Sequence, residues 1–392
     1  MIFNSVTFLL FLVLAAGLYW VLPRRPRLWM LFSASLVFYG FWRVEFLPVM
    51  LASTLVDYVA ARAIHDSEDE RRRRVYLGVS LAINLGLLFY FKYLIFFASN
   101  GAGLLRAAGF DVPDPRWNII LPLGISFYTF QTISYTIDVY RRLIRPEREF
   151  VLYACYVTFF PQLVAGPILR AREVIGQLNA RPAFDLSDLA IGVRRILFGL
   201  FLKVVLADNL APLVEAGFAE PVRMLGALDI WTLAFLFGFQ IYFDFSAYSH
   251  IALGSARLMG IRFPENFDFP YLATSPRDFW KRWHISLSSW IRDYLYLPLM
   301  GEAVRDDSTG GLAQAVDDRR ERRRVRSLFL TWAIMGLWHG ANWTFVLWGV
   351  YHAVLVYLHR VIGPRLPVLP MRAAAVGGWL VTLPLAMLGW IP

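Results

Sequence analysis

Residues 331–352, TWAIMGLWHGANWTFVLWGVYH, decide the fold of this chain, because they are apolar enough to lie in a membrane and yet carry histidine and asparagine. A polar side chain inside a membrane costs free energy, so an intramembrane imidazole such as that of His339 is a functional candidate. Gly336, Gly340 and Gly349 allow neighbouring helices to approach closely around it. The stretch therefore predicts a membrane protein with a chemical centre at His339.

A second stretch, residues 277–298 (RDFWKRWHISLSSWIRDYLYLP), is centred on His284. Its aromatic and amphipathic character favours a helix that lies at the cytoplasmic interface or dips into it. The cations in this stretch are able to bind the phosphates of a phosphorylated donor, although contact with lipid headgroups alone is an open alternative. We expect His284 and His339 to form one acyl-transfer centre, with the donor held by Lys281, Arg282 and Arg292.

The composition indicates a polytopic membrane protein. Of the 392 residues, 58% are hydrophobic and 16% aromatic, whereas a soluble protein of this length would expose far more charge. The formal net charge of +10 is attributed to the arginine excess of cytoplasmic segments, and no nucleic-acid partner is expected. Cys155 is the only cysteine, which excludes an intrachain disulfide and favours a packing role over a nucleophilic one.

The apolar runs predict an all-α fold with about ten spans in one membrane domain over residues 1–392, whose catalytic part covers about 119–362. A re-entrant segment at 150–169 is broken by proline and glycine. The charged residues 65–74 and 306–326 are expected to be cytoplasmic loops, the second of them disordered, with both termini outside. The predicted spans cover residues 5–22, 28–42, 46–64, 75–98, 119–139, 189–218, 228–256, 327–342, 343–362 and 371–391.

The residues themselves favour histidine chemistry. His339 and His352 have no acidic residue or cysteine at metal-ligand spacing, so no metal site is expected, and there is no phosphate-binding loop or Gly-x-Ser-x-Gly elbow. A neutral imidazole beside Trp338 fits a general base that accepts the proton of a hydroxyl. Asn342 would share the helix face of His339 if the helix continues through Gly340, and it would then support the developing oxyanion or fix the histidine tautomer.

Asp244 is the other polar residue expected at membrane depth, in the span predicted for residues 228–256. A carboxylate there has to face a protein interior or a polar funnel. Both a structural partner and a role in supporting the site are open for it.

Long ordered stretches of the sequence resemble the membrane-bound O-acyltransferases, in particular their bacterial branch that acetylates alginate. The resemblance is carried by RDFWKRWHISLSSWIRDYLYLPL, MGLWHGANWTFVLWGVYH, YFDFSAYSHIALGSARLMGIRFPENFDFPYLATS, FFPQLVAGPILR and LPLGISFYTFQTISYTIDVYR. It implies that the principal histidine of the family is His339 and the second histidine of the branch is His284. Members of this branch usually continue with further membrane helices past the Leu-Gly-Trp at 388–390.

The resemblance further implies a multi-pass protein of the bacterial inner membrane with no bound cofactor. Acetyl-CoA from the cytoplasm would be the donor, and hydroxyls of an exported polysaccharide such as alginate the final acceptor. The partners would be a periplasmic acetyltransferase or esterase-like protein and the polysaccharide synthesis machinery.

Two alternatives remain open at this stage. The branch that D-alanylates teichoic acids is a near relative, and an exporter of D-alanyl or other acyl groups would need an acyl carrier protein as donor. A transporter without acyl-transfer chemistry would line its substrate path with the same polar residues, but such proteins often show inverted repeats, and none is evident here.

Overall fold

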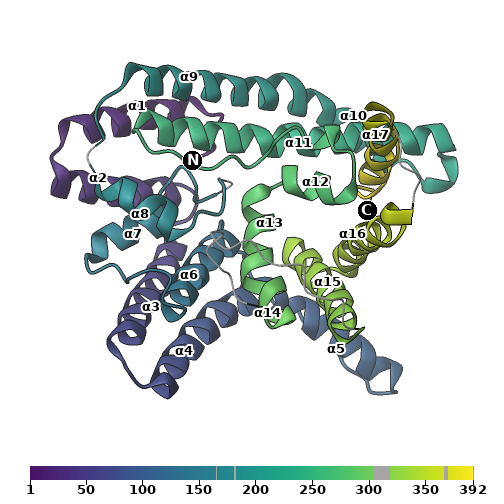
Figure 1. Cartoon of the computed structure of the whole chain (residues 1–392), viewed down its shortest axis with the longest axis horizontal. Coiled ribbons are helices and arrows are strands. Elements are labelled where there is room, and N and C mark those ends of the chain that lie inside the picture. The colour runs from purple at the N-terminus through teal and green to yellow at the C-terminus, as the bar shows by residue number, and fades with distance from the viewer. Residues whose placement is uncertain (165, 181, 303–317, 366–369, 392) are drawn as a thin grey trace. The chain divides into compact units, whose positions relative to one another are not determined.

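The computed structural model describes residues 1–164, 166–180, 182–302, 318–365 and 370–391, and every regular element within them is a helix (Figure 1). This confirms the predicted all-α class. The chain divides into two compact units, one of residues 1–204 and 245–264 and the other of residues 205–244 and 265–392. Each unit is described by itself.

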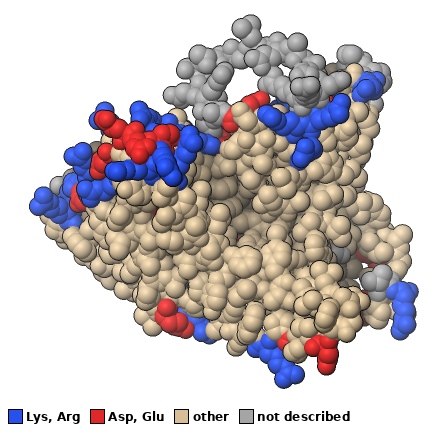
Figure 2. All heavy atoms as spheres, turned by 90° about the horizontal axis from the view of Figure 1, so that it is seen from below, with Lys and Arg blue, Asp and Glu red and all other residues tan. Residues whose placement is uncertain are grey.

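Within the described residues, five helical segments are long and apolar enough to cross a membrane, so the chain has the character of a multi-pass membrane protein. Figure 2 shows the corresponding surface: charged side chains gather in patches, and a broad area of this face carries none. The helix Val6–Val21 is apolar but shorter. The full set of about ten spans stays a prediction. The five segments are Val44–Asp66, Glu70–Ala107, Ala227–Leu258, Trp343–Arg365 and Met371–Leu388.

The first unit is built mainly from nine helices, and a π-helical segment, Phe89–Tyr93, joins α4 to α5. Its core is rich in buried tyrosine and phenylalanine. The helices are α1 (Val6–Val21), α2 (Arg24–Gly40), α3 (Leu47–Asp66), α4 (Glu70–Leu88), α5 (Leu94–Ala107), α6 (Ile125–Tyr140), α7 (Phe150–Thr158), α8 (Ala171–Asn179) and α9 (Leu186–Leu200).

A buried polar network fixes α3, α4 and α6 against one another. The Asn84 amide donates to the carboxylate of Asp57 at 2.9 and 2.8 Å, and the hydroxyls of Ser80 and Thr136 also donate to this carboxylate. Ser53 donates to the carbonyl oxygen of the same asparagine at 2.7 Å. A buried network in which each member finds a partner specifies one packing of the helices. Thr132 and Thr136, both within the span predicted for residues 119–139, thus serve helix packing.

The predicted re-entrant segment is broken in the structure, as expected. Helix α7 ends at Thr158, and the described residues up to Arg170 form turns and irregular backbone that is buried almost throughout. A Cβ atom at Gly124 would lie 2.3 Å from the carbonyl oxygen of Leu163, so only glycine fits where this segment meets the start of α6. Cys155 is fully buried, with its Sγ 3.1 Å from the carbonyl oxygen of Leu28, which confirms its packing role.

Two predicted cytoplasmic loops are wrong in their extent. Helix α3 runs to Asp66 and α4 begins at Glu70, so only residues 67–69 connect them, and Asp69 caps α4 by accepting from the backbone N–H of Arg71 at 2.8 Å. Residues 318–326 belong to the helix Asp318–His339, whereas residues 306–317 lie outside the described residues. Arginine is a good helix former, and a run of charges that alternate in sign gains ion pairs between successive turns.

The second unit holds the helices around the two predicted histidines. Helices α15 and α16, which precede the C-terminal helix, pack closely against each other (Figure 1). The helices are α10 (Asp208–Ala219), the first part of α11 (Ala227–Leu258), α12 (Pro276–Arg282), α13 (Ile285–Ile291), α14 (Leu297–Met300), α15 (Asp318–His339), α16 (Trp343–Ile362) and α17 (Met371–Leu388).

Glycine is what lets α15 and α16 approach so closely. A Cβ atom at Gly336 would lie 2.1 Å from the carbonyl oxygen of Phe345, and one at Gly349 would lie 2.1 Å from the carbonyl oxygen of Trp332. Backbone therefore packs on backbone, as expected from the glycines of the sequence. This contact sets the position of the α15 end, where His339 lies.

Candidate active site

His339 is the last residue of α15 and lies between two tryptophan rings. The centroid of its imidazole is 5.0 Å from that of Trp338 and 5.0 Å from that of Trp348 on α16, with both pairs edge to face. Trp338 is 7% exposed. The aromatic surroundings expected around His339 are therefore present, and the supporting role of Trp338 stays a prediction.

The role expected for Asn342 depended on a helix that continues through Gly340, and that expectation is wrong. Helix α15 ends at His339, and Asn342 is instead the N-cap of α16, where its side-chain oxygen accepts from the backbone N–H of Thr344 at 3.3 Å. Asparagine is among the preferred N-cap residues because its carbonyl oxygen satisfies a free N–H of the first turn. The asparagine is exposed and does not share a helix face with His339.

His284 interrupts the helix that was expected across residues 276–298. Its φ of +43° is left-handed, so α12 ends at Arg282 and α13 begins at Ile285. A non-glycine residue in this region costs about 1–3 kcal/mol and persists only where the surroundings impose it, which is typical of functional sites. The imidazole itself is buried, at 2% exposed, and stacks near the ring of Phe267.

Hydrogen bonds on both sides of His284 impose this conformation. The backbone N–H of Ile285 donates to the carbonyl of Asn266 at 2.9 Å, and the hydroxyl of Ser286 donates to the Asn266 side chain at 2.8 Å. Before the break, the N–H of Asp268 donates to the carbonyl of Arg282 at 2.9 Å. The segment around Asn266 therefore holds His284 in place, a role that its sequence spacing did not reveal.

The structure brings the two predicted histidines together. The His339 imidazole lies within electrostatic range of both His284 and His352. Burial, and secondarily the charge of a protonated His339, hold the pKa of His284 well below its usual range. His284 is therefore neutral at physiological pH, as a group that accepts or relays a proton has to be.

His352 lies within an aromatic cluster. It is 1% exposed, and its ring centroid is 4.9 Å from those of Trp280 and Trp348 and 5.8 Å from that of Trp332. The cluster links α12, α15 and α16, because each of these helices contributes a tryptophan. Aromatic contacts of this kind stabilise packing beyond the area they bury.

A cavity of about 380 Å³ lies beside this cluster. Its α15 wall is formed by a stripe at helical spacing, Leu328, Thr331, Trp332 and Met335. His339 follows Met335 by one helical turn and so continues the same face of α15. A ligand in the cavity that extends along this stripe would reach His339.

The opposite wall of the cavity carries the cations. Two of the three cations expected to bind a donor, Lys281 and Arg292, line it, and so does Arg277, one turn before Lys281. Their role in donor binding stays a prediction. Arg282 does not line the cavity. Its guanidinium is held by Asp278, at 3.0 Å, and by Asp268, at 3.5 Å, so it stabilises the fold instead.

Asp244 lies on α11 and is partly buried. Its neighbours on the helix, Tyr242 and Phe243, belong to the aromatic packing around Tyr271 and Trp283. Its role in supporting the site stays a prediction.

Replacing His284 by asparagine is expected to lower acyl transfer by about tenfold or more, which is less than the loss expected for a general base. Asparagine tolerates the left-handed conformation, so the variant separates the imidazole from the backbone break. The transfer rate and the melting temperature of purified protein measure the two effects. An asparagine variant as fast as the wild type would show that the imidazole has no part in the reaction.

A helical membrane protein with a half-buried histidine one turn beyond a cation-lined cavity, and two buried histidines within electrostatic range of it, has the makeup of a membrane acyltransferase. The comparison with known families agrees: residues 140–389 match the MBOAT, membrane-bound O-acyltransferase family. The chain belongs to this family and is an O-acyltransferase.

Relatives are similar to the chain along its whole length. It is 38% identical to the probable alginate O-acetylase of Azotobacter vinelandii over 397 residues, which cover 100% of this chain and 74% of the relative. It is 34% identical to the peptidoglycan O-acetyltransferase of Helicobacter pylori, over 99% of this chain and 74% of the relative. The similarity to the teichoic acid D-alanyltransferase of Bacillus subtilis, 30%, covers 62% of this chain and 60% of the relative.

Proposed function

We propose that the protein transfers an acetyl group from acetyl-CoA in the cytoplasm towards hydroxyls of an exported polysaccharide such as alginate. The observation that supports this most directly is the stripe on α15, along which one helix face passes from the cation-lined cavity to His339. The relatives that match the whole chain are named as O-acetylases of alginate and peptidoglycan, both of which are polysaccharides or contain one.

In the proposed binding mode, Arg277 and Lys281 contact the phosphates of coenzyme A at the cavity mouth. Both are exposed cations one helical turn apart, and a phosphate group accepts hydrogen bonds from each. The apolar wall formed by Trp332 and Met335 then receives the acyl-bearing end of the donor. The thioester is thereby directed to His339 and kept from water by the tryptophans.

The chemical step follows from the position of His339. Its neutral imidazole takes the proton from the incoming hydroxyl as that oxygen attacks the acetyl carbonyl. The tetrahedral intermediate collapses with cleavage of the carbon–sulfur bond, and the coenzyme A thiolate leaves and recovers the proton from the imidazolium. His284, neutral and within electrostatic range, orients the donor or assists this proton movement.

The proposal includes a location and a partner. The protein would lie in the bacterial inner membrane with about ten spans and its basic segments in the cytoplasm. The immediate acceptor would be the hydroxyl of a periplasmic esterase-like protein or of the polysaccharide itself, within the synthesis machinery. A second candidate, transfer of a D-alanyl or other acyl group from a carrier protein, is favoured only by the partial similarity to a D-alanyltransferase.

Purified protein reconstituted in vesicles tests the donor. Labelled acetyl-CoA should transfer its acetyl group to added polysaccharide or acceptor protein, whereas transfer only from an acyl carrier protein would favour the second candidate. Arg277→Gln and Lys281→Gln should each raise the KM for acetyl-CoA by about tenfold or more with little change in kcat, because a hydrogen bond to a charged group contributes about 1.5–3 kcal/mol.

The matched control is Arg223→Gln, an exposed arginine of the same unit that does not line the cavity. Its KM should equal that of the wild type. Unchanged KM values in both cavity variants would place the donor site elsewhere.

A further inference from the structure

A second cation-lined region lies in the first unit, where α3 meets α4 and α6 leads into α7. Two cavities adjoin there, of about 500 Å³ and about 340 Å³, and His65 and Arg145 line both of them. The first is also lined by Arg62 and Arg148, and the second by Arg73 and Arg142. The acyl-transfer mechanism uses none of these residues.

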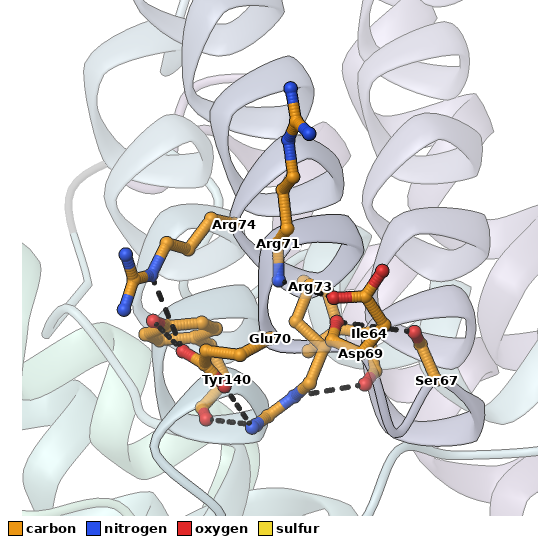
Figure 3. Close-up of polar contacts among 8 residues, drawn as sticks. All are labelled: Ile64, Ser67, Asp69, Glu70, Arg71, Arg73, Arg74 and Tyr140. Carbon is orange, nitrogen blue, oxygen red and sulfur yellow. Dashed lines mark hydrogen bonds and ion pairs between the residues drawn. The ribbon is translucent and has the colours of Figure 1, made fainter.

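Arg73 forms a fixed inner wall of the smaller cavity. Figure 3 shows its guanidinium reaching between the ends of three helices, where it donates to the carboxylate of Glu70 at 2.8 Å and to the backbone carbonyls of Ile64 and Tyr140. It is only 6% exposed. The Tyr140 hydroxyl also donates to Glu70. The charge of this arginine is therefore satisfied within the fold, and its bonds tie α3, α4 and α6 together at the cavity.

The remaining arginines are differently placed. Among the described residues, no carboxylate pairs with the side chains of Arg142, Arg145 or Arg148, and all three are exposed. Arg142 has a φ of +61° at the end of α6, where the N–H of Leu143 bonds back to the carbonyl of Asp138. Glycine is the usual residue at this position of such a helix end, so an arginine there is held in a strained conformation at the rim of the cavity.

Carboxylates are present as well. Asp66 and Glu147 line the larger cavity and Glu68 the smaller, against five arginines over the two. The Glu147 carboxylate is engaged locally, because it accepts from the backbone N–H groups of Arg148 and Glu149 at 2.7 and 2.9 Å. Positively charged hydrogen-bond donors therefore outnumber the carboxylates around these cavities. Such a concave site suits a tetrahedral oxyanion with several acceptor oxygens.

The position of the cavities points to the source of that oxyanion. They lie at the ends of two segments able to span a membrane, Val44–Asp66 and Glu70–Ala107, at the short turn that joins them. Such a position is at the boundary between the acyl chains and water, where lipid headgroups lie. We infer that the cavities lined by Arg142, Arg145 and Arg148 bind the headgroup phosphate of a phospholipid, which would tie the α3–α4 turn to the segment between α6 and α7.

Native mass spectrometry of the full chain with added lipid tests this inference. Phosphatidylglycerol should bind, and a galactolipid with the same acyl chains but no phosphate should not compete with it. Arg145→Gln should weaken phosphatidylglycerol binding by about fivefold, because one cation near a lipid surface contributes about 1 kcal/mol and this one lines both cavities. Arg145→Lys, which keeps the charge, should retain most of the binding.

The control is Arg116→Gln, the same change at an exposed arginine between α5 and α6 that lines neither cavity. The melting temperatures of all three variants without lipid report whether each is folded. Equal binding of phosphatidylglycerol by folded Arg145→Gln and wild-type protein would overturn the site. If free glycerol 3-phosphate bound the protein as tightly as phosphatidylglycerol does, the inference that the phosphate belongs to a lipid would be wrong.

Discussion

Replacing His339 by alanine is expected to lower the rate of acyl transfer by about 10²–10⁴-fold, the usual cost of losing a general base. The imidazole lies at the end of the α15 stripe, between Trp338 and Trp348. Its removal leaves the hydroxyl of the acceptor without a base at the point of attack. The backbone contact between α15 and α16 does not depend on this side chain, so the variant should fold and insert.

The rate of transfer from labelled acetyl-CoA in a single turnover measures the effect. Donor binding is measured separately, as the amount of labelled acetyl-CoA that stays with the protein on a filter. The KM for acetyl-CoA should stay close to that of the wild type, since the cations of the cavity are untouched. His359→Ala provides the control, because this histidine is exposed in the last turn of α16. If purified His339→Ala kept most of the wild-type rate, the reaction centre would have to lie elsewhere in the chain.

Gly349→Ala is expected to have the second large effect, through the position of α15. The added Cβ would lie 2.1 Å from the carbonyl oxygen of Trp332 and 3.3 Å from the nitrogen of Gly336, so the two helices have to move apart. Overpacking of this kind typically costs about 1–3 kcal/mol. A displacement of about 1 Å at a reacting group is enough to lower the rate by about 10²-fold, so kcat should fall far more than the loss of stability explains.

The same substitution at Gly377 is the matched control. This glycine lies in α17, in the same unit, and a Cβ atom there meets nothing within 4 Å. Alanine is favoured over glycine in a helix by about 1 kcal/mol, so Gly377→Ala should be as stable as the wild type or more stable, with an unchanged rate. Measurements of kcat and melting temperature compare the two variants. A Gly349→Ala variant with wild-type kcat would mean that the close approach of α15 and α16 does not place a group that the reaction needs.

Much of the site was predictable because its signals are local. A histidine in a long apolar stretch is costly, so its presence indicated function, and the glycines around it indicated close helix packing. The broken segment at 150–169 was predictable from its prolines and glycine for the same reason. Arg282, by contrast, could not be separated from Lys281 by sequence, because both are basic and adjacent; only the helix rotation decides which one faces the cavity.

The sequence by itself determined the helical membrane class and the family, and it singled out the two candidate histidines, since these depend on hydropathy, composition and ordered motifs. The tertiary structure decided what depends on distant contacts. Asn266 fixes the break at His284, which no helical periodicity of residues 276–298 predicts. The end of α15 at His339 assigned Asn342 to the cap of α16. Arg277 lines the cavity beside α15, and Arg145 lines the second cation-lined region. Both placements required residues from several helices, because a cavity is formed only when the chain has folded.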